Sequence, residues 1–237
     1  MRFTESDQFA EATQNPRRHV RSFVRRDGRI TASQKAALQT LSTRYQISPG
    51  NVTDSSQSLF VRDAPIVVEI GFGDGENLIA QARSRPDLNF IGCEPYLSGV
   101  GRVMSRLDAA GLTNVRLVAD DAVPFISRGL SASSVSGWMI FFPDPWPKKR
   151  HHKRRLLNAE FLTLLATRSA PRATLKIATD WPDYAEHIAE AIPDAPAWRW
   201  VNPGAPGLRP AARPLTRFER RGIRAGNPIR DFLLIRD

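Results

Sequence analysis

From Pro65 onwards, short apolar runs alternate with segments of helical pattern, and this order limits the possible folds more than any other feature of the sequence. The runs are too short for buried helices and are typical of strands buried in a sheet. The expected strands and helices in chain order are 66–70, 76–83, 89–93, 97–110 and 115–118, with further strands at 135–142, 173–178 and 229–235. Such an order predicts a parallel sheet with right-handed crossovers and helices on both faces.

Residues 1–60 differ in composition from the rest of the chain. They are rich in Arg, Gln, Ser and Thr, which indicates a basic N-terminal arm ahead of a domain at 61–237. The basic cluster at 17–26 has two interpretations, contact with RNA and an ordinary solvated tail. A short helix is expected at 33–44, with Ser33 as its cap.

Composition and charge narrow the class of protein. A chain of 237 residues with 41% apolar content suffices for one globular domain with an appended arm. The formal net charge of +10 indicates an acidic partner such as a nucleic acid. No apolar run approaches the roughly 20 residues that span a bilayer, and the N-terminus lacks the apolar core of a signal peptide, so we expect a cytoplasmic protein with no membrane partner. Cys93 is the only cysteine and His151 and His152 lack a third ligand, so neither a disulfide nor a metal is expected.

A glycine-rich turn follows the first strand. Gly71, Gly73 and Gly75 allow a backbone with positive φ and the close approach of a ligand. Asp74 and Glu76 add negative charge to the same turn, which disfavours a pyrophosphate and therefore a dinucleotide. Many such turns hold glycine only for packing, so the turn alone is a weak signal of a ligand site.

Acids at the ends of the strands strengthen the interpretation as a cofactor site. Glu94 lies about 20 residues after the turn, the spacing at which an acid accepts hydrogen bonds from ribose hydroxyls. Asp121 is placed to reach an adenine amino group, and Glu69 to pair with an ammonium or sulfonium cation. This set of acids favours S-adenosylmethionine over a nicotinamide cofactor.

The segment 141–155 combines a carboxylate, an aromatic ring and a dense cationic run. Prolines on both sides stiffen the turn that carries Asp144 and Trp146. The cationic run has two interpretations, binding of RNA phosphates and an ordinary solvated face. Trp146 also has two, stacking on an exposed base and burial in the core, of which burial is slightly favoured.

Together these segments closely resemble the bacterial tRNA (guanine-N7)-methyltransferase family, one of the class I S-adenosylmethionine-dependent methyltransferases. The matching segments are 21–26, 69–75, 92–94, 121–122, 141–155, 179–180 with Tyr184, and 216–219. The Pro-Asp-Pro-Trp motif with its basic run is the specific part of this resemblance, whereas the glycine turn is common to many methyltransferases. The fold implied is α/β, a doubly wound, mostly parallel seven-stranded sheet of Rossmann-like type.

The resemblance also implies roles for individual residues. Asp144 would be the catalytic residue, and the cofactor-binding positions would be Glu69, Gly71, Gly73, Glu94, Asp121 and Asp144. The substrate-binding positions would be Lys148, Asp180, Thr216, Arg217, Phe218 and Glu219. The RNA-binding positions would be Arg150, His151, His152, Lys153, Arg154 and Arg155. Arg217 stands where this family commonly has Lys, which leaves the detail of that contact open.

The reaction implied is methyl transfer from S-adenosylmethionine to N7 of guanine 46 in the variable loop of tRNA. Guanine N7 has an in-plane lone pair and no proton, so a fixed carboxylate at Asp144 serves to stabilise the positive charge that arrives on the base. Asp180 has two interpretations, a contact to the guanine edge and a cap for the helix that follows. Two other functions stay open, an amino-methyltransferase on another nucleic acid and a catalytically silent RNA-binding protein of the same fold.

Overall fold

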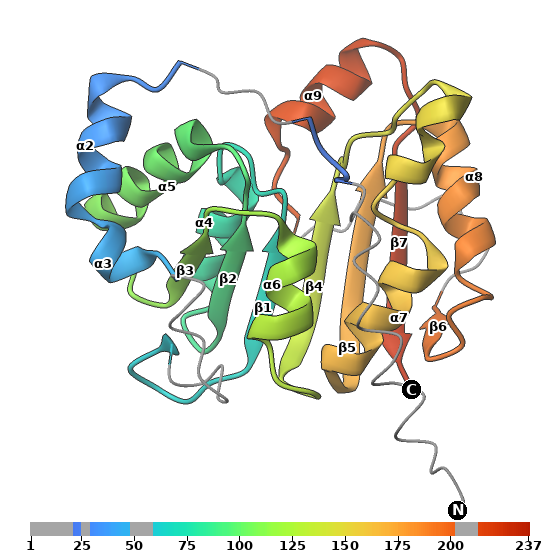
Figure 1. Ribbon diagram of the computed structural model, residues 1–237, viewed down its shortest axis with the longest axis horizontal. Coiled ribbons are helices and arrows are strands. Elements are labelled where there is room, and N and C mark those ends of the chain that lie inside the picture. The colour runs from blue at the N-terminus through green and yellow to red at the C-terminus, as the bar shows by residue number, and fades with distance from the viewer. Residues whose placement is uncertain (1–20, 25–28, 48–58, 202–212) are drawn as a thin grey trace, which may run out of the picture.

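The computed structural model describes residues 21–24, 29–47, 59–201 and 213–237. In these ranges one sheet of seven strands has the order β3-β2-β1-β4-β5-β7-β6 (Figure 1). The strands are β1 Ile66–Ile70, β2 Asn89–Cys93, β3 Val115–Val118, β4 Val135–Phe141, β5 Ser169–Thr179, β6 Trp198–Trp200 and β7 Arg230–Arg236. β1 to β5 are parallel, and β7 is antiparallel to both of its neighbours. The expected doubly wound, mostly parallel sheet of seven strands is therefore confirmed.

Helices cover both faces of the sheet (Figure 1). On one face lie α2 Ala32–Thr40, α4 Glu76–Ser84 and α5 Leu97–Ala109, and the short α3 Ser42–Tyr45 follows α2. On the other face lie α6 Ala122–Gly129, α7 Ala159–Arg168 and α8 Pro182–Ala191. The 3-10 helix η3 Lys149–Arg154 follows the end of β4, and α9 Arg217–Arg224 lies at the same edge of the sheet. Among the described residues, no helix combines the length and the apolar character that crossing a membrane requires.

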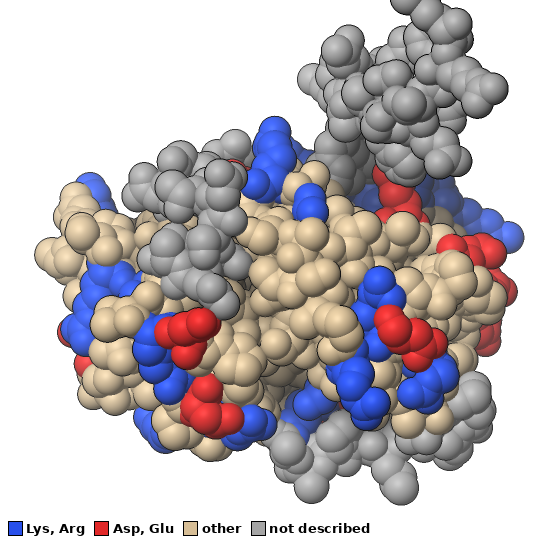
Figure 2. Space-filling model, turned by 90° about the horizontal axis from the view of Figure 1, so that it is seen from below, with Lys and Arg blue, Asp and Glu red and all other residues tan. Residues whose placement is uncertain are grey.

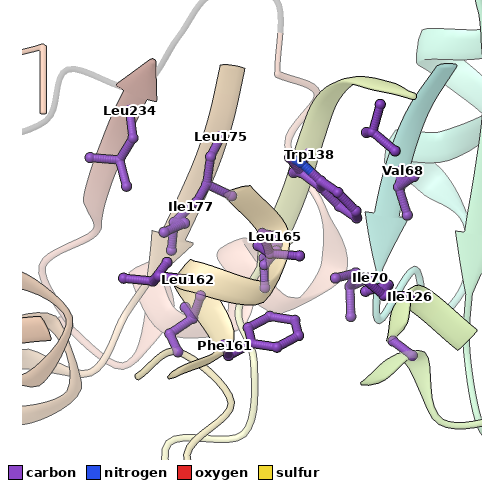
Figure 3. Packing of buried hydrophobic residues seen from close by; sticks show 14 of the residues in the cluster. Val68, Ile70, Ile126, Trp138, Phe161, Leu162, Leu165, Leu175, Ile177 and Leu234 are labelled. Carbon is purple, nitrogen blue, oxygen red and sulfur yellow. The ribbon is translucent and has the colours of Figure 1, made fainter. Parts of the chain in front are cut away.

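Side chains that alternate along each strand fill two cores, one on each face. In β1, Val68 and Ile70 face the core that includes Trp138 of β4 and Leu165 of α7 (Figure 3). Glu69, between them, faces the opposite side, where it meets α4. Because a central parallel strand is buried on both faces, its sequence is a nearly continuous apolar run, which in β1 only Glu69 interrupts.

Most of the expected strand positions are confirmed. The strands at 66–70, 89–93 and 115–118 have the expected bounds, and the helices at 76–83 and 97–110 each differ by one residue at the C-terminal end. The strand expected at 173–178 is longer, the one at 135–142 ends one residue earlier, and the one at 229–235 is shifted by one residue. The elements that were not predicted are α6, α7, η3, β6 and α9.

The helix expected at 33–44 begins earlier and is interrupted. Thr31, and not Ser33, is the cap, because the Thr31 side chain accepts a hydrogen bond from the Gln34 backbone while the Gln34 side chain accepts one from the Thr31 backbone. This reciprocal pair is a capping box, which the Thr-x-x-Gln spacing signals. The helix stops at Leu41, where α3 begins.

The expected arm contains residues that pack with the domain. Tyr45 and Ile47 are buried in the cores on the two faces of the sheet, and Gln46 forms a bridge to Leu117 of β3. Residues 45–47 therefore pack as part of the domain in this structure, and the division of the chain at residue 60 stays a prediction. Much of the expected basic cluster at 17–26 lies outside the described residues.

Candidate active site

The main cavity lies where the winding of the sheet reverses direction. Connections from β1 lead first to β2 and β3 on one side, and the chain then returns to β4 on the other side of β1. At the carboxyl ends of these strands is a cavity of about 310 Å³. This is the place where open α/β sheets bind their ligands. Its lining includes Gly71 and Gly73 of the turn, Glu94, Asp121 and Asp144, so the fold brings together five of the expected cofactor positions.

The glycine turn has the backbone conformation that its sequence requires. Gly71, Gly73 and Gly75 have φ values of 75°, 53° and 71°, which lie in the left-handed region where a Cβ atom is disfavoured. The two acids of the turn are engaged in ion pairs with arginines. Asp74 pairs with Arg102 of α5 and Arg217 of α9. These ion pairs hold α5 and α9 against the turn.

Glu94 and Asp121 are buried and held by backbone donors. Glu94 is 4% exposed, and its two carboxylate oxygens accept hydrogen bonds from the backbone N–H groups of Gly73 at 2.9 Å and Tyr96 at 3.1 Å. Burial raises the pKa of Glu94, and these two donors oppose that rise. Asp121 is the cap of α6 and accepts a hydrogen bond from the Val123 backbone at 3.1 Å. Both carboxylates are therefore fixed in orientation before any ligand arrives.

Glu69 is separated from the main cavity by the turn. It lines a second, small cavity of about 20 Å³ on the α4 side, together with Asn77, whose Nδ2 donates a hydrogen bond to Glu69 Oε2 at 3.0 Å. Burial raises the pKa of Glu69 from its ordinary value of 4.5 to about 7. The two cavities share Gly71 and Phe218 among their lining residues, so they adjoin.

The turn that carries Asp144 is held in an uncommon backbone conformation. Phe142 and Trp146 have φ values of 54° and 48°, in the left-handed region that non-glycine residues rarely adopt. Between them Asp144 is exposed and lines the main cavity. Strained residues persist only where their surroundings determine them, and they gather at functional sites. The left-handed backbone at Phe142 and Trp146 therefore restrains the turn in addition to its prolines.

Arg155 departs from the expectation for the basic run. Its side chain is 2% exposed, its Nε donates to the Pro145 carbonyl at 3.0 Å, and its Nη2 pairs with Asp183 of α8. The guanidinium also lies over the Tyr184 ring, 5.0 Å from the ring centroid. A buried guanidinium that is already paired is poorly placed to bind RNA phosphates, so the structure disfavours the expected RNA contact at Arg155, which stays a prediction. Through its hydrogen bond to the Pro145 carbonyl, Arg155 helps to fix the Asp144 turn.

The other expected RNA contacts lie at the surface on η3. Arg150 and Lys153 are exposed, and Arg154 lies over the Trp146 ring at 4.8 Å. Partial desolvation and then the charges of neighbouring cations lower the pKa of His151. The run is therefore a dense positive surface directly after the Asp144 turn.

The N-terminal segment 21–24 crosses the mouth of the main cavity. Trp146 Nε1 donates to the Ser22 carbonyl at 2.8 Å, and Tyr96 Oη donates to the Val24 carbonyl at 2.6 Å. Phe23 packs edge-on against Tyr96, with ring centroids 6.3 Å apart, and lines the cavity. Trp146 is half-buried by these contacts, so its ring anchors the segment instead of entering the core.

Asp180 does not cap α8. The cap of that helix is Trp181, with no side-chain hydrogen bond, so the cap interpretation is wrong. Asp180 instead accepts a hydrogen bond from Asn227 Nδ2 at 3.3 Å and packs against Gly222 of α9. A Cβ atom at Gly222 would lie 2.7 Å from the Asp180 carboxylate, so glycine lets α9 approach this acid.

The expected substrate motif 216–219 is divided between surface and interior. Thr216 caps α9 by accepting a hydrogen bond from the Glu219 backbone, and Phe218 is 51% exposed beside both cavities. Glu219 is fully buried and pairs through both oxygens with Arg213, at 2.7 and 3.0 Å. Lys148, the remaining expected position, is exposed at the start of η3.

Arg213 is a residue that sequence reasoning missed. It is 3% exposed, and besides Glu219 it pairs with Asp231 of β7 at 3.1 Å. Its guanidinium lies over the rings of Phe141 and Phe142, at 5.4 and 5.5 Å from their centroids. It thus joins α9, β7 and the start of the Asp144 turn. Its setting in a stretch rich in proline and alanine carries no local signal of this role.

Comparisons with known proteins give a family match and close relatives by sequence. The model of a family described as "Putative methyltransferase" matches residues 63–232. A protein of Chromohalobacter salexigens named "tRNA (guanine-N(7)-)-methyltransferase" is 44% identical over 229 residues, which cover 95% of this chain and 93% of that protein. A protein of the same name from Nitrosococcus oceani is 43% identical, over 90% of this chain and 89% of its own.

Solved structures support the fold at much lower identity. A structure titled as the 16S rRNA methyltransferase KamB has a TM-score of 0.51 at 17% identity, with 89% of this chain and 97% of that chain covered. A 16S rRNA (adenine(1408)-N(1))-methyltransferase from Catenulisporales acidiphilia has a TM-score of 0.52 at 17% identity, with 76% and 88% covered. At this identity the likeness concerns the sheet and its helices alone.

Proposed function

We propose, on the premise that this chain belongs to the family of tRNA (guanine-N(7)-)-methyltransferases, that it methylates N7 of guanine 46 in the variable loop of tRNA. The methyl donor is S-adenosylmethionine, which when bound supplies a methyl group activated on a sulfonium. The observation that carries the proposal is the convergence of Glu94, Asp121 and Asp144 on one cavity at the reversal point of the sheet.

The chemistry of the lining residues fits that donor. The Glu94 oxygens each accept one backbone hydrogen bond, and a carboxylate oxygen has a further lone pair to accept a ribose hydroxyl. Asp121 follows β3 and lines the same cavity, where a carboxylate can accept a hydrogen bond from an adenine amino group. Glu69 lies behind the turn in the adjoining cavity, where a buried carboxylate attracts an ammonium group. Asp74 of the turn lines the same cavity, so a pyrophosphate bound there would lie beside a carboxylate.

Asp144 stabilises the charge that develops on the target base. Guanine becomes cationic as its N7 lone pair takes up the methyl group, and no proton has to leave first. A carboxylate held by a strained turn keeps its position during the reaction, so it lowers the barrier without reorganisation. Arg155 and the left-handed residues on either side of the turn hold Asp144 in place.

Asp144→Asn tests this role. The variant keeps the size of the side chain and removes its charge, so single-turnover transfer is expected to fall by about 100-fold or more while affinity for S-adenosylmethionine changes little. Asp194→Asn makes the same charge change at an exposed position away from the cavity and should transfer at the wild-type rate. Near-normal single-turnover transfer by Asp144→Asn refutes the assignment.

The product identifies the reaction. Unmodified tRNA incubated with the protein and a labelled methyl donor should become cleavable at 7-methylguanosine at one position of the variable loop. A label on an exocyclic amine would point instead to an amino-methyltransferase. Calorimetry that detects no binding of S-adenosylmethionine would leave a catalytically silent RNA-binding protein.

A further inference from the structure

The arginines of α9 gather on one face of that helix. At 3.6 residues per turn, the four positions fall within an arc of about 100°. We call them the α9 arginine face, which consists of Arg217, Arg220, Arg221 and Arg224. The opposite side of the helix, with Glu219 and Gly222, is buried against the domain. The helix is therefore divided sharply into a buried side and a cationic side.

Two members of this face dock α9 on the glycine turn. Arg217 pairs with Asp74 at 3.3 Å, and Arg220 pairs with Glu76 at 2.7 Å. The other two, Arg221 and Arg224, are exposed, and their side chains make no hydrogen bond or ion pair within the described part of the chain. Two of the four arginines of α9 therefore help to pack the helix on the domain, whereas Arg221 and Arg224 have no such structural role among the described residues.

The charge around the turn remains unbalanced. Asp74 and Glu76 are the two carboxylates of this group, and Arg102 and Arg106 of α5 also contact Asp74. With Arg102 and Arg106, the α9 arginine face makes six arginines around these two carboxylates. Asp180 beside α9 and the buried cluster of Arg213, Glu219 and Asp231 each subtract one charge, which leaves an excess of about two positive charges. An excess of this size attracts a polyanion.

The α9 arginine face adjoins the mouth of the active site. Arg217 and Phe218 line the small cavity, and Phe218 also lines the main one. The basic run of η3 begins on another rim of the main cavity, a few residues after Asp144. Seen from below, the opposite edge of the sheet carries basic and acidic side chains intermixed around an uncharged centre (Figure 2).

We propose that the α9 arginine face binds tRNA phosphates on a second side of the target base, in addition to η3, with Arg221 and Arg224 as contacts that serve RNA alone. The proposal rests on the proposed function, because a base that enters an acidic cavity brings its flanking phosphates to the rim. Guanidinium groups bind phosphate oxygens through paired hydrogen bonds. Each phosphate that they neutralise releases counterions, which makes the contact measurable from its salt dependence.

The test is the double variant Arg221→Ala/Arg224→Ala, with tRNA affinity measured over a range of salt concentrations in the absence of methyl donor. Alanine is a good helix former, and both positions are exposed, so the helix is retained. Loss of two contacts should reduce the slope of log affinity against log salt by roughly 1.4 to 1.8. Raising the salt from roughly 50 to 200 mM should therefore weaken tRNA binding by the variant about tenfold less than it weakens binding by the wild type.

The matched control is Arg83→Ala/Arg128→Ala, which removes the same charge from the last turns of α4 and α6. These turns lie at the edge where the parallel strands begin, away from the site, so the control slope should equal that of the wild type. Arg221→Lys/Arg224→Lys keeps the charge and should keep most of the slope. A slope for the alanine variant that equals the control slope overturns the proposal.

The salt titration and the assay for 7-methylguanosine together separate this inference from the proposed function. If wild-type protein forms 7-methylguanosine but the alanine variant has an unchanged slope, the α9 surface is refuted and the function stands. If the slope falls but the wild type forms no 7-methylguanosine, the RNA surface stands and the function is refuted.

Discussion

Replacing Glu69 by glutamine should make the protein more stable at alkaline pH while it weakens the methyl-donor site. Glu69 is 4% exposed in the central strand β1, and its carboxylate accepts a hydrogen bond from Asn77. Burial raises the pKa of Glu69 from 4.5 to about 7, and the nearby charge of Glu94 adds to the rise. The native protein therefore ionises this carboxylate at a cost.

The sign and size of the effect follow from proton linkage. Between pH 4.5 and 7 the unfolded chain has released the Glu69 proton while the native state retains it, so the free energy of unfolding falls as pH rises. A pKa that rises from 4.5 to about 7 corresponds to about 3 kcal/mol of stability, which is fully present below pH 4.5 and fully lost above pH 7. A glutamine side chain at this position does not titrate, and it keeps an oxygen that accepts the Asn77 hydrogen bond.

Denaturant unfolding at pH 5 and pH 8 measures this difference. Glu69→Gln should unfold with nearly wild-type free energy at pH 5 and with up to about 3 kcal/mol more at pH 8. Glu76→Gln is the control, because the hydrogen bonds from Arg220 and Arg217 outweigh desolvation and lower the pKa of Glu76, so this variant should not gain stability as pH rises. Equal unfolding free energies of Glu69→Gln and the wild type at pH 8 would refute the reasoning. Calorimetry should show weaker binding of S-adenosylmethionine by the same variant.

Two further outcomes follow from contacts between distant segments. Arg213→Met leaves Glu219 buried without its bidentate partner, so the free energy of unfolding should fall by about 3 to 5 kcal/mol in a denaturant titration. A fall in the free energy of unfolding of less than about 1 kcal/mol would contradict a buried ion pair at this position. Tyr96→Phe removes the hydrogen bond to the Val24 carbonyl, which stabilises the 21–24 segment over the cavity by a net of about 1 kcal/mol. Bound S-adenosylmethionine should therefore dissociate several-fold faster in a stopped-flow chase. An unchanged dissociation rate would show that the 21–24 segment does not retain the donor.

The candidate site was predictable wherever a local pattern marks the end of a strand. Glu94 and Asp121 directly follow strands whose bounds the apolar runs predict, and parallel strands bring their carboxyl ends to one edge. Asp144 was predictable from its prolines and the basic run beside it. Arg213 was not, because its partners Glu219 and Asp231 lie on α9 and β7 and no local spacing signals the contact.

Local patterns of side chains, a few residues long, are enough to specify the alternation of buried strands and helices, the glycine turn and the acids that follow the strands. Which charges lie inside depends instead on contacts between distant segments. Arg155 and Arg154 are neighbours in one basic run, yet Arg155 is buried on Asp183 of a distant helix while Arg154 stays at the surface. A charge enters the interior only where folding brings it a partner that offsets its desolvation, and that partner is set by the packing of the whole domain.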